Sequence, residues 1–248
     1  MNAELLELTK DRHLRVVFDS VPSKGIDATD TPAGRAAADR EYFEAVRREG
    51  ASRNFGFDGV TRLAGNVGYL NYSTFFPRDM SLPTARGAVA LLASTDAVIV
   101  DLRRNTGGDP NMVSWLAGLF VDSVARVGTV YDRIGNRTDT SFVRPTEGND
   151  SLRRQPLCIL TSRTIFSAPE AFAISLQTIG RAVVVGERTA GGAHLTSGFR
   201  IDDHFSIRVP HARAIPDWEG IGVKPDVDAP AEQALRVAHL AALERLQR

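Results

Sequence analysis

The sequence predicts an α/β domain in which helices cover a mixed, largely parallel sheet. Three apolar segments have the composition of strands buried on both faces of a sheet. They are residues 96–102 ("DAVIVDL"), 156–162 ("PLCILTS") and the first part of 182–194 ("AVVVGERTAGGAH"). Segments with helical spacing separate them, and this alternation favours a largely parallel sheet under helices. A chain of 248 residues with 43% hydrophobic content is long enough to bury one sizeable core.

Hydrophobic spacing and turn residues predict the other elements in chain order. Thr31 and Gly50 mark the start and the stop of one long helix, and Asp202–Asp203 mark a tight turn between two strands. We expect a short helix at 4–10, a strand at 13–21, a loop at 23–34, a helix at 32–50, a strand at 66–75, helices at 82–95 and 111–123, a surface hairpin within 128–155, a helix opening at Ser167, an antiparallel pair at 199–210 and a closing helix at 231–247.

The composition argues against several classes of function. Thirty basic residues balance thirty acidic ones, so no net field attracts nucleic acid or an anionic membrane. No apolar run reaches the roughly 18 residues of a membrane span. The N-terminus lacks the apolar core of a signal peptide, which leaves the localisation open. Cys158 is the only cysteine and is expected in the core, and with five scattered histidines it predicts no metal site.

Two loops that follow buried strands carry candidate functional groups. Gly107 and Gly108 follow the first strand, and Ser167 follows the second. In open α/β sheets, ligands gather at the carboxyl ends of strands. The glycine pair is either a simple tight turn or a place where backbone N–H groups bind an oxyanion. The pattern alone leaves both interpretations open.

Ser167 also has two interpretations. With Glu170 it forms the S-x-x-E spacing of a helix capping box. Pro169 suits the first helical turn and leaves the Ala168 N–H free as an oxyanion donor. A serine hydroxyl becomes a nucleophile only with a base and an orienting group, which this stretch does not supply.

Six segments occur in order within about residues 11–228: "DRHLRV", "NVGYLNYSTF", "DAVIVDLRRNTGGDP", "LTSRTIFSAPEAFA", "GRAVVVGERTAGGAH" and "WEGIGVKPDVD". Together they resemble a family of serine peptidases that includes the C-terminal processing (tail-specific) proteases, the tricorn core and the interphotoreceptor retinoid-binding protein modules. The resemblance implies a crotonase-like ββα core with Ser167 as the nucleophile. It also implies that the Ala168 N–H is one oxyanion donor, with Gly107 as the first choice and Gly108 as the second choice for the other.

The resemblance also points to a base. Tail-specific proteases place a lysine at the position of Gly192 here, so a Ser–Lys dyad is not expected. Tricorn-like members use a histidine and a glutamate, which the matching segments supply as His13 and Glu219. Without the resemblance, His13 would be interpreted as a core histidine and Glu219 as a solvated turn residue. His194 lies close to Gly192, and we expect it to be solvated.

The interval between His13 and Asn66 is too short for the PDZ domain that many members carry. We therefore expect one peptidase-like domain at 1–248, with 23–52 as a helical loop insertion. The predicted domain resembles the PDZ-less branch of the family, which includes the retinoid-binding protein modules. We expect it to lack the N-terminal helical bundle of that branch. The resemblance suggests export, as is common in the family, and leaves a homo-oligomer open.

The implied activity is that of a serine endopeptidase. It would act on a peptide or unfolded protein through an acyl-enzyme, with no metal or organic cofactor. Two alternatives remain open. One is a non-catalytic module that binds an apolar ligand such as a retinoid or a fatty acid, and the other is a pseudoenzyme scaffold.

Overall fold

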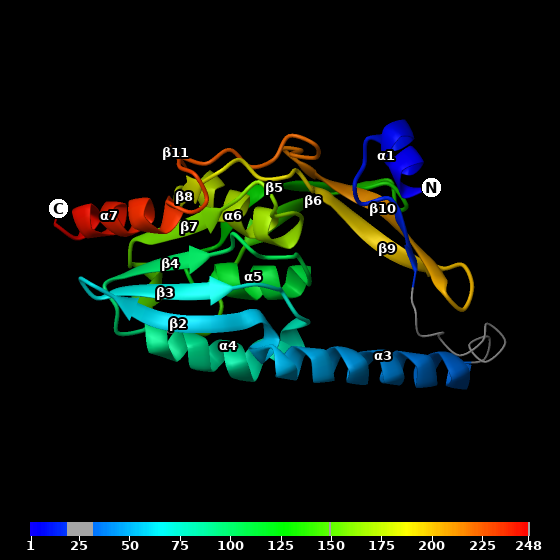
Figure 1. The fold of residues 1–248 in the computed structure, drawn as a ribbon, viewed down its shortest axis with the longest axis horizontal. Helices are drawn as coiled ribbons and strands as arrows, with labels where there is room; N and C mark the ends of the chain where they lie inside the picture. Colours follow the sequence, from blue (N-terminus) through cyan, green and yellow to red (C-terminus); the bar gives the residue numbers. More distant parts are fainter. Residues whose placement is uncertain (19–31, 149, 248) are drawn as a thin grey trace.

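The computed structural model describes residues 1–18, 32–148 and 150–247, which form an α/β fold with two sheets (Figure 1). The larger sheet has six strands in the order β11-β8-β7-β4-β3-β2, and only the β2–β3 pair is antiparallel. The predicted mixed, largely parallel sheet is therefore confirmed. Its strands are β2 (Phe57–Leu63), β3 (Val67–Tyr72), β4 (Ala97–Asp101), β7 (Leu157–Thr161), β8 (Val183–Gly186) and β11 (Val227–Asp228).

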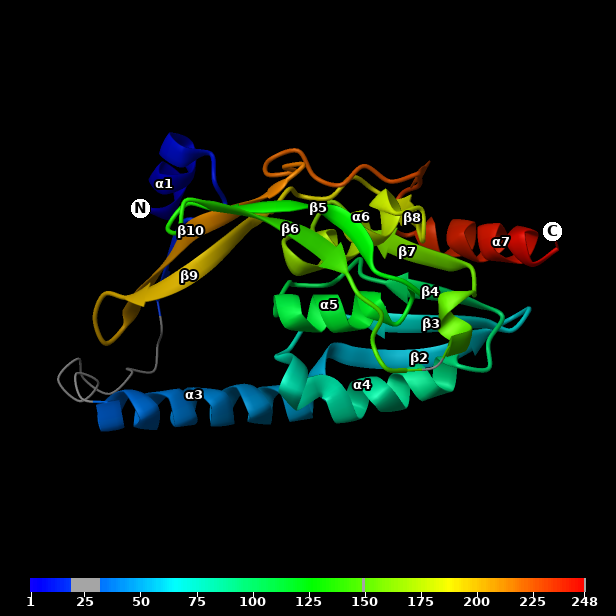
Figure 2. The ribbon, with the colours of Figure 1, turned by 180° about the vertical axis from the view of Figure 1, so that it is seen from behind.

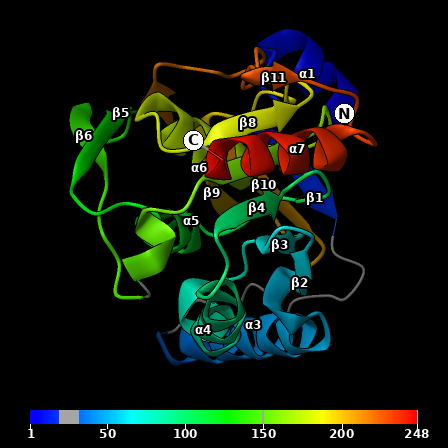
Figure 3. The ribbon, with the colours of Figure 1, turned by 90° about the vertical axis from the view of Figure 1, so that its left-hand side faces the viewer.

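Helices cover both faces of the larger sheet (Figure 3). On one face lie α4 (Arg78–Leu92), α5 (Pro110–Gly118) and α6 (Ala168–Thr178), and on the other lies α7 (Ala234–Leu246). Within the described residues, no helix combines the length and the apolar character needed to cross a bilayer.

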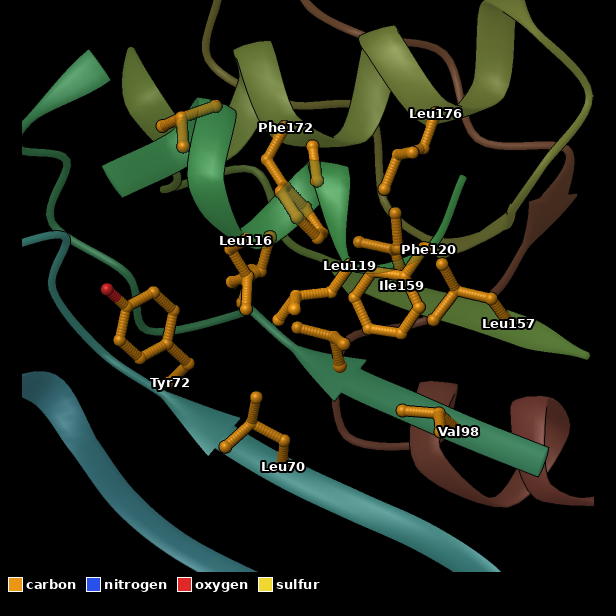
Figure 4. Close-up of a cluster of buried hydrophobic side chains, with 14 of the residues drawn as sticks. Leu70, Tyr72, Val98, Leu116, Leu119, Phe120, Leu157, Ile159, Phe172 and Leu176 are labelled. Atoms are coloured by element: carbon orange, nitrogen blue, oxygen red, sulfur yellow. The ribbon is translucent and has the colours of Figure 1, made fainter. Parts of the chain in front are cut away.

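The central strands are apolar throughout because each face of the sheet has its own core. Val98 and Ile159 point into the core that includes Phe172 and Leu176 of α6 (Figure 4). Their chain neighbours Ile99 and Cys158 point to the opposite face, under α7. This period of two is the pleat of a strand buried on both sides. Cys158 is fully buried in the core, as expected, and this burial raises the pKa of its thiol to about 11.

The smaller sheet is antiparallel and is organised around β10, which pairs with β1, β5 and β9. The predicted hairpins are both present, as β5–β6 and β9–β10. Because β1 pairs with β10, the N-terminal segment is attached to the C-terminal half of the chain. The strands are β1 (Arg15–Phe18), β5 (Ala125–Asp132), β6 (Arg137–Val143), β9 (His194–Arg200) and β10 (Phe205–Ile215).

The remaining elements lie outside these layers. α1 (Asn2–Thr9) buries no residue, and α3 (Pro32–Ser52) extends on the same side as the β9–β10 hairpin (Figures 1 and 2). The predicted loop at 23–34 falls mostly outside the described residues. β2 has no counterpart among the expected strands, because its sequence "FDGVTRL" combines glycine and polar residues at an exposed edge. Two 3₁₀ helices complete the fold, at Asn54–Gly56 and Asp150–Arg153.

Phe172 tests this core because it is fully buried and its ring lies 6.2 Å from that of Phe75. We expect Phe172→Ala to lower the free energy of unfolding by about 3–5 kcal/mol, through lost burial and an unfilled cavity. Phe43→Ala removes a ring that is 49% exposed and should cost under about 0.5 kcal/mol. Urea denaturation measures both variants, and equal losses would contradict the assignment of the core.

Candidate active site

Ser167 is the last residue before α6 and has an unusual backbone. Its φ of 73° lies in the left-handed region, which residues other than glycine rarely adopt. Such strain persists only where neighbouring contacts enforce it. One contact is the Ser167 N–H, which donates to the Glu170 carboxylate at 2.7 Å. The S-x-x-E spacing therefore places the Glu170 carboxylate where it caps the first turn of α6.

Glu170 also accepts hydrogen bonds that the capping-box spacing does not predict. Its side chain is fully buried and also accepts the N–H groups of Gly191, at 2.8 Å, and Gly192, at 2.7 Å. The Thr189 hydroxyl donates to the same carboxylate. Glu170 thus ties the start of α6 to the loop after β8. The helix pattern could not show these tertiary bonds.

A second carboxylate, Glu219, accepts the next two N–H groups of that loop. Ala193 donates to Glu219 Oε2 at 2.7 Å and His194 at 3.2 Å. Gly191, near the end of the loop, allows a close approach to the chain at Gly220, since a Cβ on Gly191 would lie 2.7 Å from the Gly220 nitrogen. Four consecutive N–H groups, those of residues 191–194, are therefore divided between Glu170 and Glu219.

The structure brings His13 to Glu219. His13 Nδ1 lies 3.5 Å from Glu219 Oε2, and each side chain is only 10% exposed. The His13 ring is also 4.3 Å from the ring of Phe166, the residue before Ser167. Within the described chain, neither His13 ring nitrogen has a hydrogen-bond partner, so the bond to the Ser167 hydroxyl is not formed in this state. Catalytic hydrogen bonds in free enzymes are often long and tighten when substrate binds.

Asp11 positions this N-terminal segment and was not identified in the sequence. Its Oδ1 accepts the His13 N–H at 2.8 Å, and its Oδ2 lies 2.6 Å from Nδ1 of His194. The first bond is an Asx turn, for which the D-x-H spacing is a usable signal. The second joins residues 183 positions apart and has no local signal. His194, expected to be solvated, is instead 20% exposed and bound to Asp11.

The corner around His194 carries excess negative charge. Burial alone would lower the pKa of His194. The hydrogen bond to Asp11 and the charges of Glu219, Asp11 and Asp217 outweigh this and raise the pKa. Three carboxylates therefore favour a cation at this place.

The glycine loop lies beside the serine, as its position after β4 predicted. A Cβ on Gly107 would lie 3.9 Å from the Ser167 Cβ. The Gly107 N–H already donates to Asn105 Oδ1 at 2.9 Å. Gly108 lines the same cavity as Ser167 and Ala168. The Gly107 N–H, the first choice from the sequence, is therefore already occupied in this structure.

A cavity of about 580 Å³ opens at Ser167, a size typical of a ligand pocket. Helices α5 and α6 and strands of the antiparallel sheet supply its walls. Its apolar lining includes Val113, Ala117, Val127, Ala171, Ile174 and Ile215.

The loop of Gly192 leaves no room for a lysine in this backbone arrangement. A Cβ at this position would lie 2.6 Å from the Phe166 ring. The packing of Phe166 is therefore consistent with the expectation that no Ser–Lys dyad operates here.

A strained serine at a helix start, a glycine turn beside it and a buried histidine next to a carboxylate are the components of a serine hydrolase. Residues 66–229 match the family model described as Peptidase family S41, and the chain belongs to this family. The family that the six segments predicted is confirmed.

Named relatives agree with this assignment. The chain is 30% identical to carboxyl-terminal-processing peptidase 2 of Arabidopsis thaliana chloroplasts, over 66% of this chain and 32% of that protein. It is 33% identical to a carboxyl-terminal-processing protease of Picosynechococcus, over 55% of this chain and 33% of that protein. The chain thus spans about a third of these relatives. A solved photosystem II D1 C-terminal processing protease superposes with a TM-score of 0.54 at 26% identity, over 67% of this chain and 43% of that one.

Glu170→Gln tests whether Glu170 holds the site together. The amide keeps the volume but presents an NH₂ group to donors that need an acceptor. We expect the free energy of unfolding to fall by about 2–4 kcal/mol. Glu49→Gln is the matched control, because Glu49 is 60% exposed and should change stability by under about 1 kcal/mol. Equal effects in guanidinium denaturation would show that Glu170 has no special structural role.

Gly108→Ala tests the glycine turn. A Cβ at Gly108, with a φ of +135°, would lie 1.9 Å from the Phe75 carbonyl oxygen. Backbone strain and overpacking should together cost about 2–4 kcal/mol of stability. Gly59→Ala is the control, because a Cβ there meets no atom within 4 Å. A thermal melt that gives the two variants the same midpoint would refute the close approach at Gly108.

Proposed function

We propose that this chain is a serine endopeptidase that uses Ser167 as the nucleophile, His13 as the base and Glu219 as the orienting carboxylate. The observation that carries the proposal is the 3.5 Å approach of His13 Nδ1 to Glu219 Oε2, next to Phe166. These groups come from the two ends of the chain. Their burial at the residue before a strained serine has no evident structural purpose.

The chemistry follows from these positions. An imidazole can accept and return a proton near neutral pH. His13 can therefore take the Ser167 proton as Oγ attacks the peptide carbonyl, and return it to the amine that leaves when the acyl-enzyme forms. Glu219, facing Nδ1, selects the tautomer and stabilises the imidazolium. Since Nε2 has no partner in the free state, the mechanism requires its bond to the Ser167 hydroxyl to form when substrate binds. Water then hydrolyses the acyl-enzyme.

The oxyanion of the tetrahedral intermediate needs donors that are already in place. The N–H groups of Ala168 and Gly108 supply them in this proposal, and the positive end of the α6 dipole adds to the stabilisation. Glu170 contributes by holding the backbone of Ser167 and takes no part in proton transfer. The mechanism requires no metal and no organic cofactor.

The proposed substrate is a peptide or an unfolded protein in an extended conformation. The apolar walls of the 580 Å³ cavity fit one apolar side chain next to the scissile bond. The names of the relatives describe processing at the carboxyl terminus, which motivates a cleavage site near a free C-terminus.

The apolar lining of the cavity also suits a non-catalytic module that binds a retinoid or a fatty acid. That function leaves the buried His13–Glu219 pair and the strained Ser167 unexplained. Tight lipid binding without any reaction at Ser167 would favour it over the peptidase.

A fluorophosphonate probe tests the peptidase, because it reacts only with an activated serine. The wild-type chain should be labelled at Ser167. Ser167→Ala should abolish labelling, and His13→Ala should slow it by at least about 10³-fold through loss of the base. Peptide mapping by mass spectrometry locates the adduct and gives its rate.

Two controls define the result. Ser52→Ala and His239→Ala change an exposed serine and a histidine of α7, and both should label like wild type. A wild-type chain that never labels, or a His13→Ala variant that labels at the wild-type rate, would contradict the proposed machinery.

A further inference from the structure

We propose that Asp11, His194 and Glu219 form a binding site for one transition-metal dication, with Zn²⁺ as the best match, and that its occupation inhibits the chain. The inhibition rests on the proposed peptidase function, whereas the metal site itself does not. The site would be regulatory, since the proposed catalysis uses no metal.

The three residues present suitable donor atoms close together. One ligand atom from each lies within 4.8 Å of the other two. His194 Nδ1 is 2.6 Å from Asp11 Oδ2 and 3.7 Å from Glu219 Oε2. Zn²⁺ binds nitrogen and oxygen at about 2.0–2.2 Å, so donors in a tetrahedral site lie about 3.3–3.5 Å apart. Side-chain shifts of under about 1 Å would therefore complete the geometry.

Unpartnered polar atoms face this cluster. Glu219 Oε1 is buried without a hydrogen-bond partner, as are both ring nitrogens of His13. His13 Nδ1 lies 3.5 Å from Glu219 Oε2 and 3.9 Å from Asp11 Oδ1. Both the His13 and the Glu219 side chains are nine-tenths buried. The unpartnered Glu219 Oε1 points to a missing ligand at this corner, and a metal bound to Glu219 would satisfy it.

The negative charge around His194 favours the binding of a dication. Asp11, Glu219 and Asp217 supply three carboxylates, and Asp217 Oδ2 lies 3.6 Å from His194 Nε2. A dication would offset the negative charge of these carboxylates. A mixed set of imidazole and carboxylate donors suits Zn²⁺, whereas Mg²⁺ and Ca²⁺ prefer oxygen ligands alone.

A bound metal would use the carboxylate that His13 needs. Glu219 is the proposed orienting group of the base, and a metal on this carboxylate would compete with His13 Nδ1 for its negative charge. Metal binding would therefore weaken the stabilisation of the His13 imidazolium and slow the reaction at Ser167. The three ligands lie at positions 11, 194 and 219, which explains why no zinc spacing appears in the sequence.

Calorimetric titration of the full chain with Zn²⁺ tests the site directly, with Mg²⁺ as the control ion. We expect one equivalent of Zn²⁺ to bind, and Asp11→Asn and His194→Gln each to weaken it at least about tenfold. His239→Gln is the matched control, because His239 contacts the Ala64 carbonyl, and it should bind as wild type does. Absence of Zn²⁺ binding, or unchanged affinity in both ligand variants, would overturn the site.

Co²⁺ gives a readout that needs no variant. Bound to the wild-type chain, it should show the strong visible absorption of a four-coordinate site, which Zn²⁺ displaces. A spectrum identical to that of hydrated Co²⁺ would overturn the site even if a ligand variant failed to fold.

Fluorophosphonate labelling tests the inhibition. Zn²⁺ should slow labelling of the wild-type chain, and EDTA should restore it. In His194→Gln, the same Zn²⁺ concentration should leave that variant's own labelling rate unchanged. Metal binding that leaves wild-type labelling unaffected would overturn the inhibition. A metal-free chain that never labels would instead refute the peptidase, while the titration still decides the metal site.

Discussion

The geometry of the candidate site depends on how two buried carboxylates divide four consecutive N–H groups. Glu170 accepts those of Gly191 and Gly192, and Glu219 accepts those of Ala193 and His194. Glu170 also holds the Ser167 N–H, so one short loop fixes the serine relative to Glu219. A buried carboxylate is costly unless several donors compensate it, which makes this arrangement both rigid and sensitive to substitution.

The proposed base, His13, lies on a segment that is held more weakly than this rigid frame. Within the described residues, β1 pairs with four residues of β10, and α1 buries no residue. The hydrogen bond between Asp11 and His194 is the contact that brings the segment to the loop. The site is therefore assembled from a stable part, which carries Ser167 and Glu219, and an N-terminal part that can adjust. The proposed mechanism needs this adjustment, because the bond between His13 and Ser167 is not yet formed. In the proposed metal site, the same adjustment would let a cation compete for Glu219.

Local patterns in the sequence were sufficient for the fold class, the hairpins and the helix that opens at Ser167. Period-two burial and helical spacing are short-range signals, and the apolar strands 97–101 and 157–161 carry them clearly. β2 lacked such a signal because it is a polar edge strand. The bonds of Glu170 to residues 189–192 and of Asp11 to His194 depend on tertiary proximity, which no spacing encodes. His13 and Glu219 were found only through the family resemblance.

The most direct test of the central claim is whether His13 and Glu219 act as one unit on Ser167. Rates of fluorophosphonate labelling would be measured for His13→Ala, Glu219→Gln and the double variant. In the proposed mechanism Glu219 assists proton transfer only through His13, and Glu219→Gln keeps a carbonyl oxygen that can accept the Ala193 and His194 N–H groups. The double variant should therefore label within about twofold of His13→Ala alone. If the two losses multiply, the residues act independently and the proposed arrangement is wrong.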